Sequence, residues 1–183
     1  TSIVLEIPAV LNQLVVEVGG AISGVGRIEA ASVSLNAGSG IGSLAAMLLA
    51  TPSILAETLA GDVQIDNSNS ATVTLLSLKA AGGLASFAQS GGGALNVSSV
   101  LNVTGNTTLS SALGNVVVNG PVNVAGGSLA VTATSGAING VGPIQAASVA
   151  FSASGGVGNL GSLNLSASSV TASAGLNGVH LAN

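Results

Sequence analysis

The chain has 183 residues, of which 48% are hydrophobic and only 4% are charged, and its formal net charge is −4. An ordinary soluble domain has about a quarter charged residues, so Ser, Thr, Asn and Gly must form most of this surface, and the abundant Val, Ile and Leu exclude intrinsic disorder. Two basic residues, Arg27 and Lys79, are too few to bind nucleic acid, and the absence of cysteine excludes disulfides and thiolate metal sites.

Small aliphatic side chains must form the core, because Phe87 and Phe151 are the only aromatic residues. Many of these side chains are β-branched, which favours strands over helices. At the N-terminus, residues 1–20 contain Glu6, Glu17 and Pro8 and no basic cluster. This segment therefore matches neither a secretory signal nor a membrane span, and we expect any signal to lie outside the chain.

A duplicated unit is the most informative feature of the sequence. Residues 21–44, AISGVGRIEAASVSLNAGSGIGSL, align without gaps to residues 137–160, AINGVGPIQAASVAFSASGGVGNL, with 14 identities in 24 positions. Within the first copy Val33, Leu35 and Ala37 alternate with polar residues. This period of two predicts a strand with one buried face.

The segment 44–61, LAAMLLATPSILAETLAG, departs from this rhythm because it is rich in Ala and Leu and contains Pro52. We expect it to contribute a wall of the same structure as its neighbours. An irregular or helical excursion, which would cover one face, is the alternative.

Similar strands recur in the second half of the chain, beginning at Ser128, Ser148, Ser162 and Ser169. The first two are 20 residues apart. Gly-Gly and Asn-Gly pairs, which can adopt positive φ, separate the strands and predict corners. A period of about 20 residues with several short strands is typical of one coil of a β-solenoid. The sequence therefore predicts an all-β fold, a parallel β-helix of roughly nine coils, with residues 1–183 as a single domain that is a segment of a longer chain or a fibre subunit.

The run SGAINGVGPIQAASVAFSASGGVGNL resembles the filamentous haemagglutinin family, the large exoproteins of two-partner secretion, in its Gly-x-Ile, Ala-x-x-Val-x-Leu-x-Ala and Gly-Ile-Gly patterns. Residues 61–97 and 115–133 are similar to strand sequences of the same family. The resemblance covers most of the chain from about Val15 onward. It implies a right-handed parallel β-helix, export through a partner pore, an extracellular or bacterial cell-surface location, and a role in adhesion or in a fibre.

Few residues suggest a site. His180 has no second ligand nearby in sequence, so we expect an ordinary surface residue. Asp62, Asp66 and Asn67 could hold calcium only if a turn separated them, because residues four apart on a strand lie about 13 Å apart.

Glycine and threonine motifs give equally weak signals. Gly24-x-Gly26 and Gly140-x-Gly142 lack the third glycine of a dinucleotide site, and residues 155–163 form one imperfect copy of a calcium-binding nonapeptide. The pairs Thr72/Thr74 and Thr132/Thr134 suggest hydroxyl rows like those of ice-binding solenoids, but we expect no row to persist over successive coils. The sequence therefore predicts no catalytic, cofactor-binding or metal-binding residue.

We expect a structural or adhesive protein, a fibre or stalk segment that is not an enzyme. A surface with so few charges does not repel a second copy, and each end of a solenoid exposes strand edges, so the predicted partner is the chain itself, end to end or side by side. A module that binds a host glycan or protein is one alternative. A β-helical enzyme acting on polysaccharides is another, but it requires paired carboxylates, and Glu29 aligns with Gln145 in the second unit.

Overall fold

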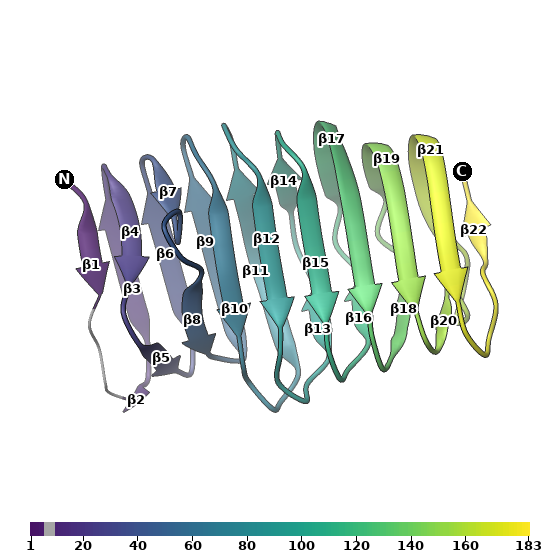
Figure 1. The fold of residues 1–183 in the computed structure, drawn as a ribbon, viewed down its shortest axis with the longest axis horizontal. Helices are drawn as coiled ribbons and strands as arrows, with labels where there is room; N and C mark the ends of the chain where they lie inside the picture. The colour runs from purple at the N-terminus through teal and green to yellow at the C-terminus, as the bar shows by residue number, and fades with distance from the viewer. Residues whose placement is uncertain (6–9) are drawn as a thin grey trace.

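The computed structural model describes residues 1–5 and 10–183, which form a parallel β-solenoid of about eight turns with roughly 21 residues per coil. Successive coils follow one another along the long axis of the molecule, from the N-terminus at one end to the C-terminus at the other (Figure 1). Glu6 and Pro8, which entered the prediction for the N-terminal segment, lie outside the described residues. The described part contains no helix, and so none that is long and apolar enough to cross a membrane.

Strands from successive coils stack in parallel rows, and two of these rows are named here by the face that they form. Face A contains β3 (Leu14–Val18), β6 (Val33–Ala37), β9 (Ser53–Thr58), the second part of β11 (Val73–Ala80), β14 (Leu101–Val103) and the first parts of β17 (Val122–Ala133), β19 (Ile144–Ala153) and β21 (Leu163–Ala174). Face B contains β1 (Ile3–Leu5), β4 (Ala21–Gly24), β7 (Gly40–Ile41), β10 (Val63–Asn67), β12 (Ala85–Gln89), β15 (Thr107–Ser111) and the second parts of β17, β19 and β21. The other described strands complete the coils: β2 (Val10–Leu11), β5 (Arg27–Ala30), β8 (Met47–Ala50), β13 (Leu95–Val97), β16 (Val116–Val118), β18 (Ala137–Gly140), β20 (Gly156–Val157) and β22 (Leu181–Ala182).

The strand pairing confirms the predicted β-solenoid and its short period. Ser128 pairs with Ser148, which is the 20-residue spacing seen in the sequence. Other coils are longer: Ala85 pairs with Thr107, 22 residues further on. Because most coils exceed 20 residues, the chain makes about eight turns and not nine. The right-handed winding stays a prediction.

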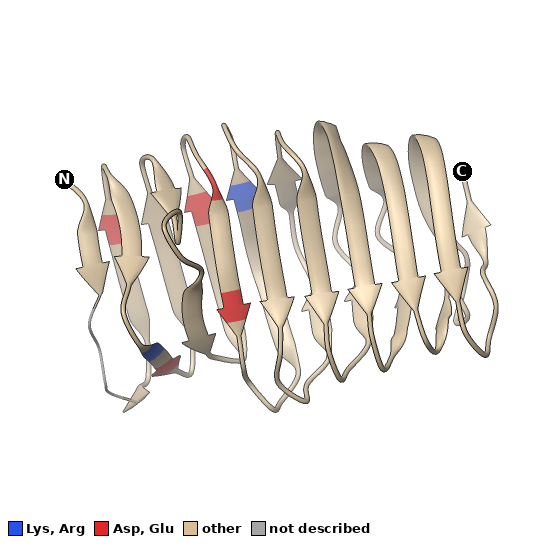
Figure 2. Cartoon of the chain, viewed as in Figure 1, with Lys and Arg blue, Asp and Glu red and all other residues tan. Residues whose placement is uncertain are grey.

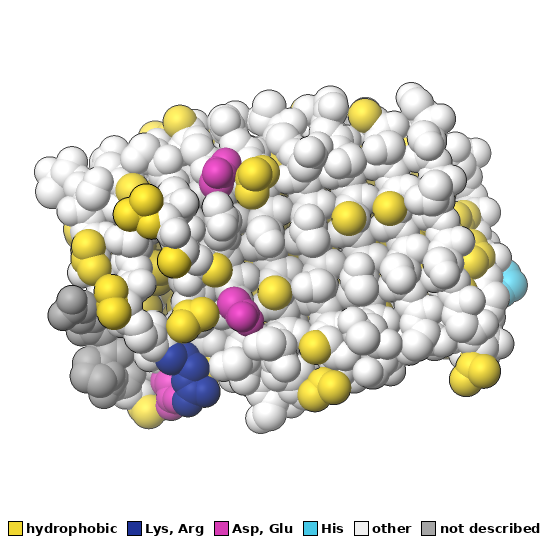
Figure 3. Space-filling view, viewed as in Figure 1, with side chains coloured by type: hydrophobic (Ala, Val, Ile, Leu, Met, Phe, Trp, Pro, Cys, Tyr) yellow, Lys and Arg dark blue, Asp and Glu magenta, His cyan; other side chains and the backbone are white. Residues whose placement is uncertain are grey.

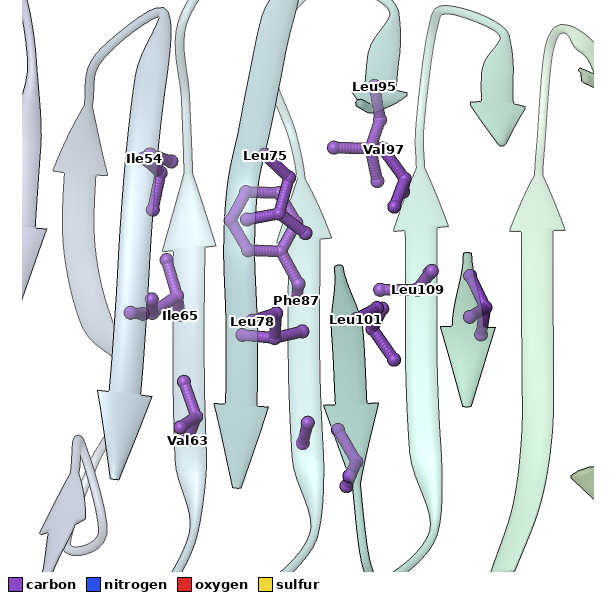
Figure 4. Close-up of a cluster of buried hydrophobic side chains, with 14 of the residues drawn as sticks. Ile54, Val63, Ile65, Leu75, Leu78, Phe87, Leu95, Val97, Leu101 and Leu109 are labelled. Atoms are coloured by element: carbon purple, nitrogen blue, oxygen red, sulfur yellow. The ribbon is translucent and has the colours of Figure 1, made fainter. Parts of the chain in front are cut away.

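The core is a single apolar cluster that runs through the stack of coils. The predicted alternation is confirmed in β6, where Val33, Leu35 and Ala37 are buried. Phe87 shows how the layers pack, because its register partners in the neighbouring coils, Ile65 and Leu109, are also buried (Figure 4). Side chains of similar size stacked in register fill the interior without large gaps.

The segment 44–61 contributes a wall of the solenoid. It contains β8 and β9, whose residues Met47 and Ile54 are fully buried, and Pro52 lies in the short connection between them. The helical alternative for this segment is therefore wrong. Irregular backbone is confined to the bends at residues 42–46, before β8.

The two copies of the duplicated unit have the same local structure but lie at different positions around the axis. Gly42 and Gly158, which are equivalent in the alignment, have φ values of 66° and 68°. The ladder that starts at Ala37 passes through Thr58, Ala80, Val103 and Val124 to Ala146. The residue equivalent to Ala37 in the second copy is Ala153, on face B. The second copy is therefore displaced around the coil relative to the first.

Buried amide side chains form a short polar ladder inside the solenoid. Asn67 is fully buried; its Nδ2 donates to the Thr51 carbonyl oxygen at 3.0 Å and to Oε1 of Gln89 at 2.8 Å. Its Oδ1 accepts a hydrogen bond from the Thr51 N–H at 3.0 Å. These bonds satisfy the buried polar groups and join neighbouring coils at one corner.

Candidate binding groove

Face A carries one outward-facing polar side chain from each of eight successive coils of the described chain, and this row is called the polar column. Its members pair in register from β3 to β21: Glu17, Asn36, Glu57, Lys79, Asn102, Asn123, Gln145 and Ser166. Neighbouring strands lie about 4.8 Å apart. The column therefore presents carboxylates, amides, an amine and a hydroxyl at a regular spacing along the axis.

The first four members of the polar column line a groove of about 540 Å³. The groove follows the ends of β3, β6 and β9, where the chain leaves face A, and Val18 and Leu59 supply apolar wall. Gly38 allows the coils to stack closely there, because a Cβ on it would overlap the carbonyl oxygen of Gly19. The glycine corners thus leave the groove open beside the longer polar side chains.

The groove contains two carboxylates and one amine, from Glu17, Glu57 and Lys79, so its formal charge is −1. Oε1 of Glu57 accepts a hydrogen bond from Oγ of Ser77 at 2.7 Å. In the part of the chain that the structure describes, the one ion pair joins Arg27 and Glu29 and lies outside the groove. The Lys79 amine is therefore not paired with the carboxylate of Glu57, and both can contact a ligand.

A second groove, of about 780 Å³, lies on the same face near the C-terminus and is lined by Asn123, Gln145, Ser166 and Asn183. Nδ2 of Asn123 donates to Oδ1 of Asn102 at 3.4 Å. The Asn183 side chain accepts a hydrogen bond from the Ala167 N–H at 3.0 Å and donates one to the Ala167 carbonyl at 3.2 Å. It thus occupies the place of a neighbouring strand beside β21.

The suggested calcium ligands do not converge. Oδ1 of Asp62 accepts a hydrogen bond from the Leu84 N–H at 3.0 Å, and Oδ1 of Asp66 accepts one from Oγ of Ser90 at 2.8 Å. Asn67 is buried next to the half-buried Asp66 and belongs to the interior ladder. No group of three or more His, Asp or Glu side chains able to hold a metal lies among the described residues.

The remaining sequence candidates serve the backbone. His180 is exposed, and its backbone pairs with Val157 and Leu163. The glycine pairs 24/26 and 140/142 lie at corners between strands, and residues 155–163 comprise β20 and the bend that follows it.

Hydroxyl rows differ from the expectation at one of the two threonine pairs. On face B, Ser110, Thr132, Ser152 and Ser173 pair in register over four coils. The expectation that no row persists was therefore wrong at Thr132. The row mixes serine with threonine, so a search for repeated threonine pairs misses it. Thr74, by contrast, pairs with Ser53 and Asn96 on another row.

Sequence reasoning missed the groove because its charged residues are far apart in the chain. Glu17, Asn36, Glu57 and Lys79 are separated by 19, 21 and 22 residues, which are the lengths of the coils between them. Adding a variable coil length to each position would have found the column. A fixed period of 20 does not.

Comparison of the chain with protein families, with curated proteins and with solved structures gave no match.

Proposed function

We propose that this chain is a structural segment of a fibre or stalk on a bacterial cell surface, that it is not an enzyme, and that it associates with further coils of the same kind. Its resemblance to the filamentous haemagglutinin family supports the extracellular location and the adhesive setting. The parallel β-solenoid supports the structural role, since such a fold extends by the addition of coils.

The exposed edge of the last coil is the observation that carries the proposal. Phe87, Leu109, Val131 and Phe151 are register partners and are all buried. Ala172 is the next partner in this inward-facing row, but it is exposed. A further coil stacked on β21 would bury it and would complete the hydrogen bonds of the strand edge, which is otherwise a template for pairing.

The distribution of charge supports side-by-side contact as well. Every Asp, Glu, Lys and Arg of the chain lies at or before position 79, so the C-terminal coils carry none (Figure 2). Face B of these coils presents rows of small, mostly polar side chains, with few apolar ones between them (Figure 3). Charge repulsion, which usually keeps protein surfaces apart, is absent there.

Two charge insertions on one strand test the proposal. Ala172→Lys places a charge on the inward-facing row of the exposed edge, and inward-pointing charges oppose edge pairing. Ser173→Lys adds the same charge one residue further on, on the outward side of face B. We expect wild type to form filaments in negative-stain electron microscopy. Ala172→Lys should shorten them, and Ser173→Lys should preserve their length while reducing bundling.

Circular dichroism and the melting temperature of both variants establish that they remain folded. The proposal fails if wild type sediments as a monomer at high concentration and gives compact particles in the microscope. It also fails if folded Ala172→Lys forms filaments as long as those of wild type.

A further inference from the structure

We propose that the groove formed by Glu17, Asn36, Glu57 and Lys79 binds an extended, neutral oligosaccharide that lies along the solenoid axis. This inference goes beyond the proposed structural function and does not depend on self-association. It rests on four side chains that successive coils hold in register and on the groove of about 540 Å³ beside them.

The spacing of the polar groups suits a sugar chain. Successive coils lie about 4.8 Å apart, which is close to the rise of one sugar ring in an extended β-1,4-linked chain. Carboxylate and amide groups such as those of Glu17, Asn36 and Glu57 have two polar atoms in one plane. They can therefore bind two neighbouring hydroxyl groups of a ring, and each coil can contact one ring.

The composition of the groove selects a neutral ligand. Glu17 and Glu57 accept hydrogen bonds from hydroxyl groups but repel the carboxylates or sulfates of an acidic polysaccharide. Lys79 is the one amine in the groove, so an anionic chain cannot be neutralised over its length. Val18 and Leu59 offer apolar surface to the C–H groups of a ring, as walls of small-molecule sites commonly do.

The rest of the polar column extends the same chemistry along face A. Asn102, Asn123, Gln145 and Ser166 continue the row without a charge, and the last three line the second groove. Hydroxyl groups pair with amides and hydroxyls as both donors and acceptors. A ligand longer than four rings can therefore follow the column beyond Lys79.

Isothermal titration with cellohexaose tests the inference, and polygalacturonate serves as the anionic comparison. We expect wild type to bind cellohexaose and not polygalacturonate. Asn36→Ala and Glu57→Gln should each weaken binding by about tenfold, the loss expected for one or two hydrogen bonds. Glu29→Gln is the matched control, because it removes the same charge at an exposed position outside the groove and should leave the affinity unchanged.

Three results would overturn the inference: no binding of cellohexaose at millimolar concentration, tighter binding of polygalacturonate, or equal affinities of wild type, Asn36→Ala and Glu57→Gln. A short extended peptide that displaces cellohexaose from wild type and binds more tightly would assign the groove to a protein partner instead. Self-association of each variant is measured separately by sedimentation, so a failure of this inference leaves the fibre proposal intact.

Discussion

Single buried amides hold the coils of this solenoid in register. Asn67 satisfies both the N–H and the carbonyl of Thr51 and also bonds to Gln89 in the next coil. A buried polar group that loses its partner costs more than the hydrogen bond itself gains. The interior ladder is therefore a point where one substitution affects several coils.

Asn67→Ala should lower the free energy of unfolding by about 2–4 kcal/mol, because it leaves the Thr51 N–H, the Thr51 carbonyl and Oε1 of Gln89 without partners in the interior. Urea unfolding followed by circular dichroism measures the change. Asn123→Ala is the control, since this exposed side chain makes one long hydrogen bond and its loss should change the free energy by less than about 0.5 kcal/mol. Equal effects of the two substitutions would contradict the structural role assigned to the ladder.

The direction of individual side chains could be predicted from alternation, but their partners could not. The buried positions Val33, Leu35 and Ala37 follow directly from the period of two. The same period places Asp66 and Asn67 on opposite faces of β10, which separates two of the suggested calcium ligands. The meeting of Glu17 with Glu57 and Lys79 depends on coil lengths, which vary from 19 to 22 residues.

At the scale of the element, the duplicated turn determines its own shape. Gly42 and Gly158 have positive φ in both copies although the copies lie at different positions around the coil. A residue with a Cβ is strained in this conformation by about 1–2 kcal/mol. The local sequence therefore encodes the strand and the turn, and the lengths of the coils between the copies decide which face each strand joins.

Gly42→Ala should destabilise the protein by about 2 kcal/mol or more, since the strain of positive φ adds to overlap of the new Cβ with the Gln64 carbonyl oxygen. Thermal unfolding measures the shift. Gly92→Ala is the matched control, because the nearest atom to its Cβ would be the Ser70 carbonyl oxygen at 3.8 Å, an ordinary contact. A melting temperature that falls equally in both variants would show that flexibility, and not the positive φ, matters at Gly42.

For the whole molecule, the fold was accessible from the sequence because the repeat is visible in composition and in spacing. Strands about 20 residues apart cannot bury their apolar faces alone, so they must stack. The number of turns and the rotation between the duplicated units were not accessible. Both depend on small differences in coil length that accumulate along the chain.

Association of the C-terminal coils should respond little to salt. Salt screens interactions between exposed charges, and the chain has no Asp, Glu, Lys or Arg after position 79. We expect sedimentation velocity to give nearly the same fraction of assembled protein at low and at high sodium chloride concentration. Dissociation on addition of salt would instead place the contact on the N-terminal coils, which carry the charges.

The direction of the hydrogen-bond ladders has a mechanical consequence. Each ladder runs from coil to coil and therefore lies along the long axis of the molecule (Figure 1). A pulling force applied between the two ends would load one coil boundary at a time and detach the coils in succession. Each detached coil of roughly 21 residues would release about 70 Å of extended chain, so the molecule would lengthen in steps and dissipate work at each one.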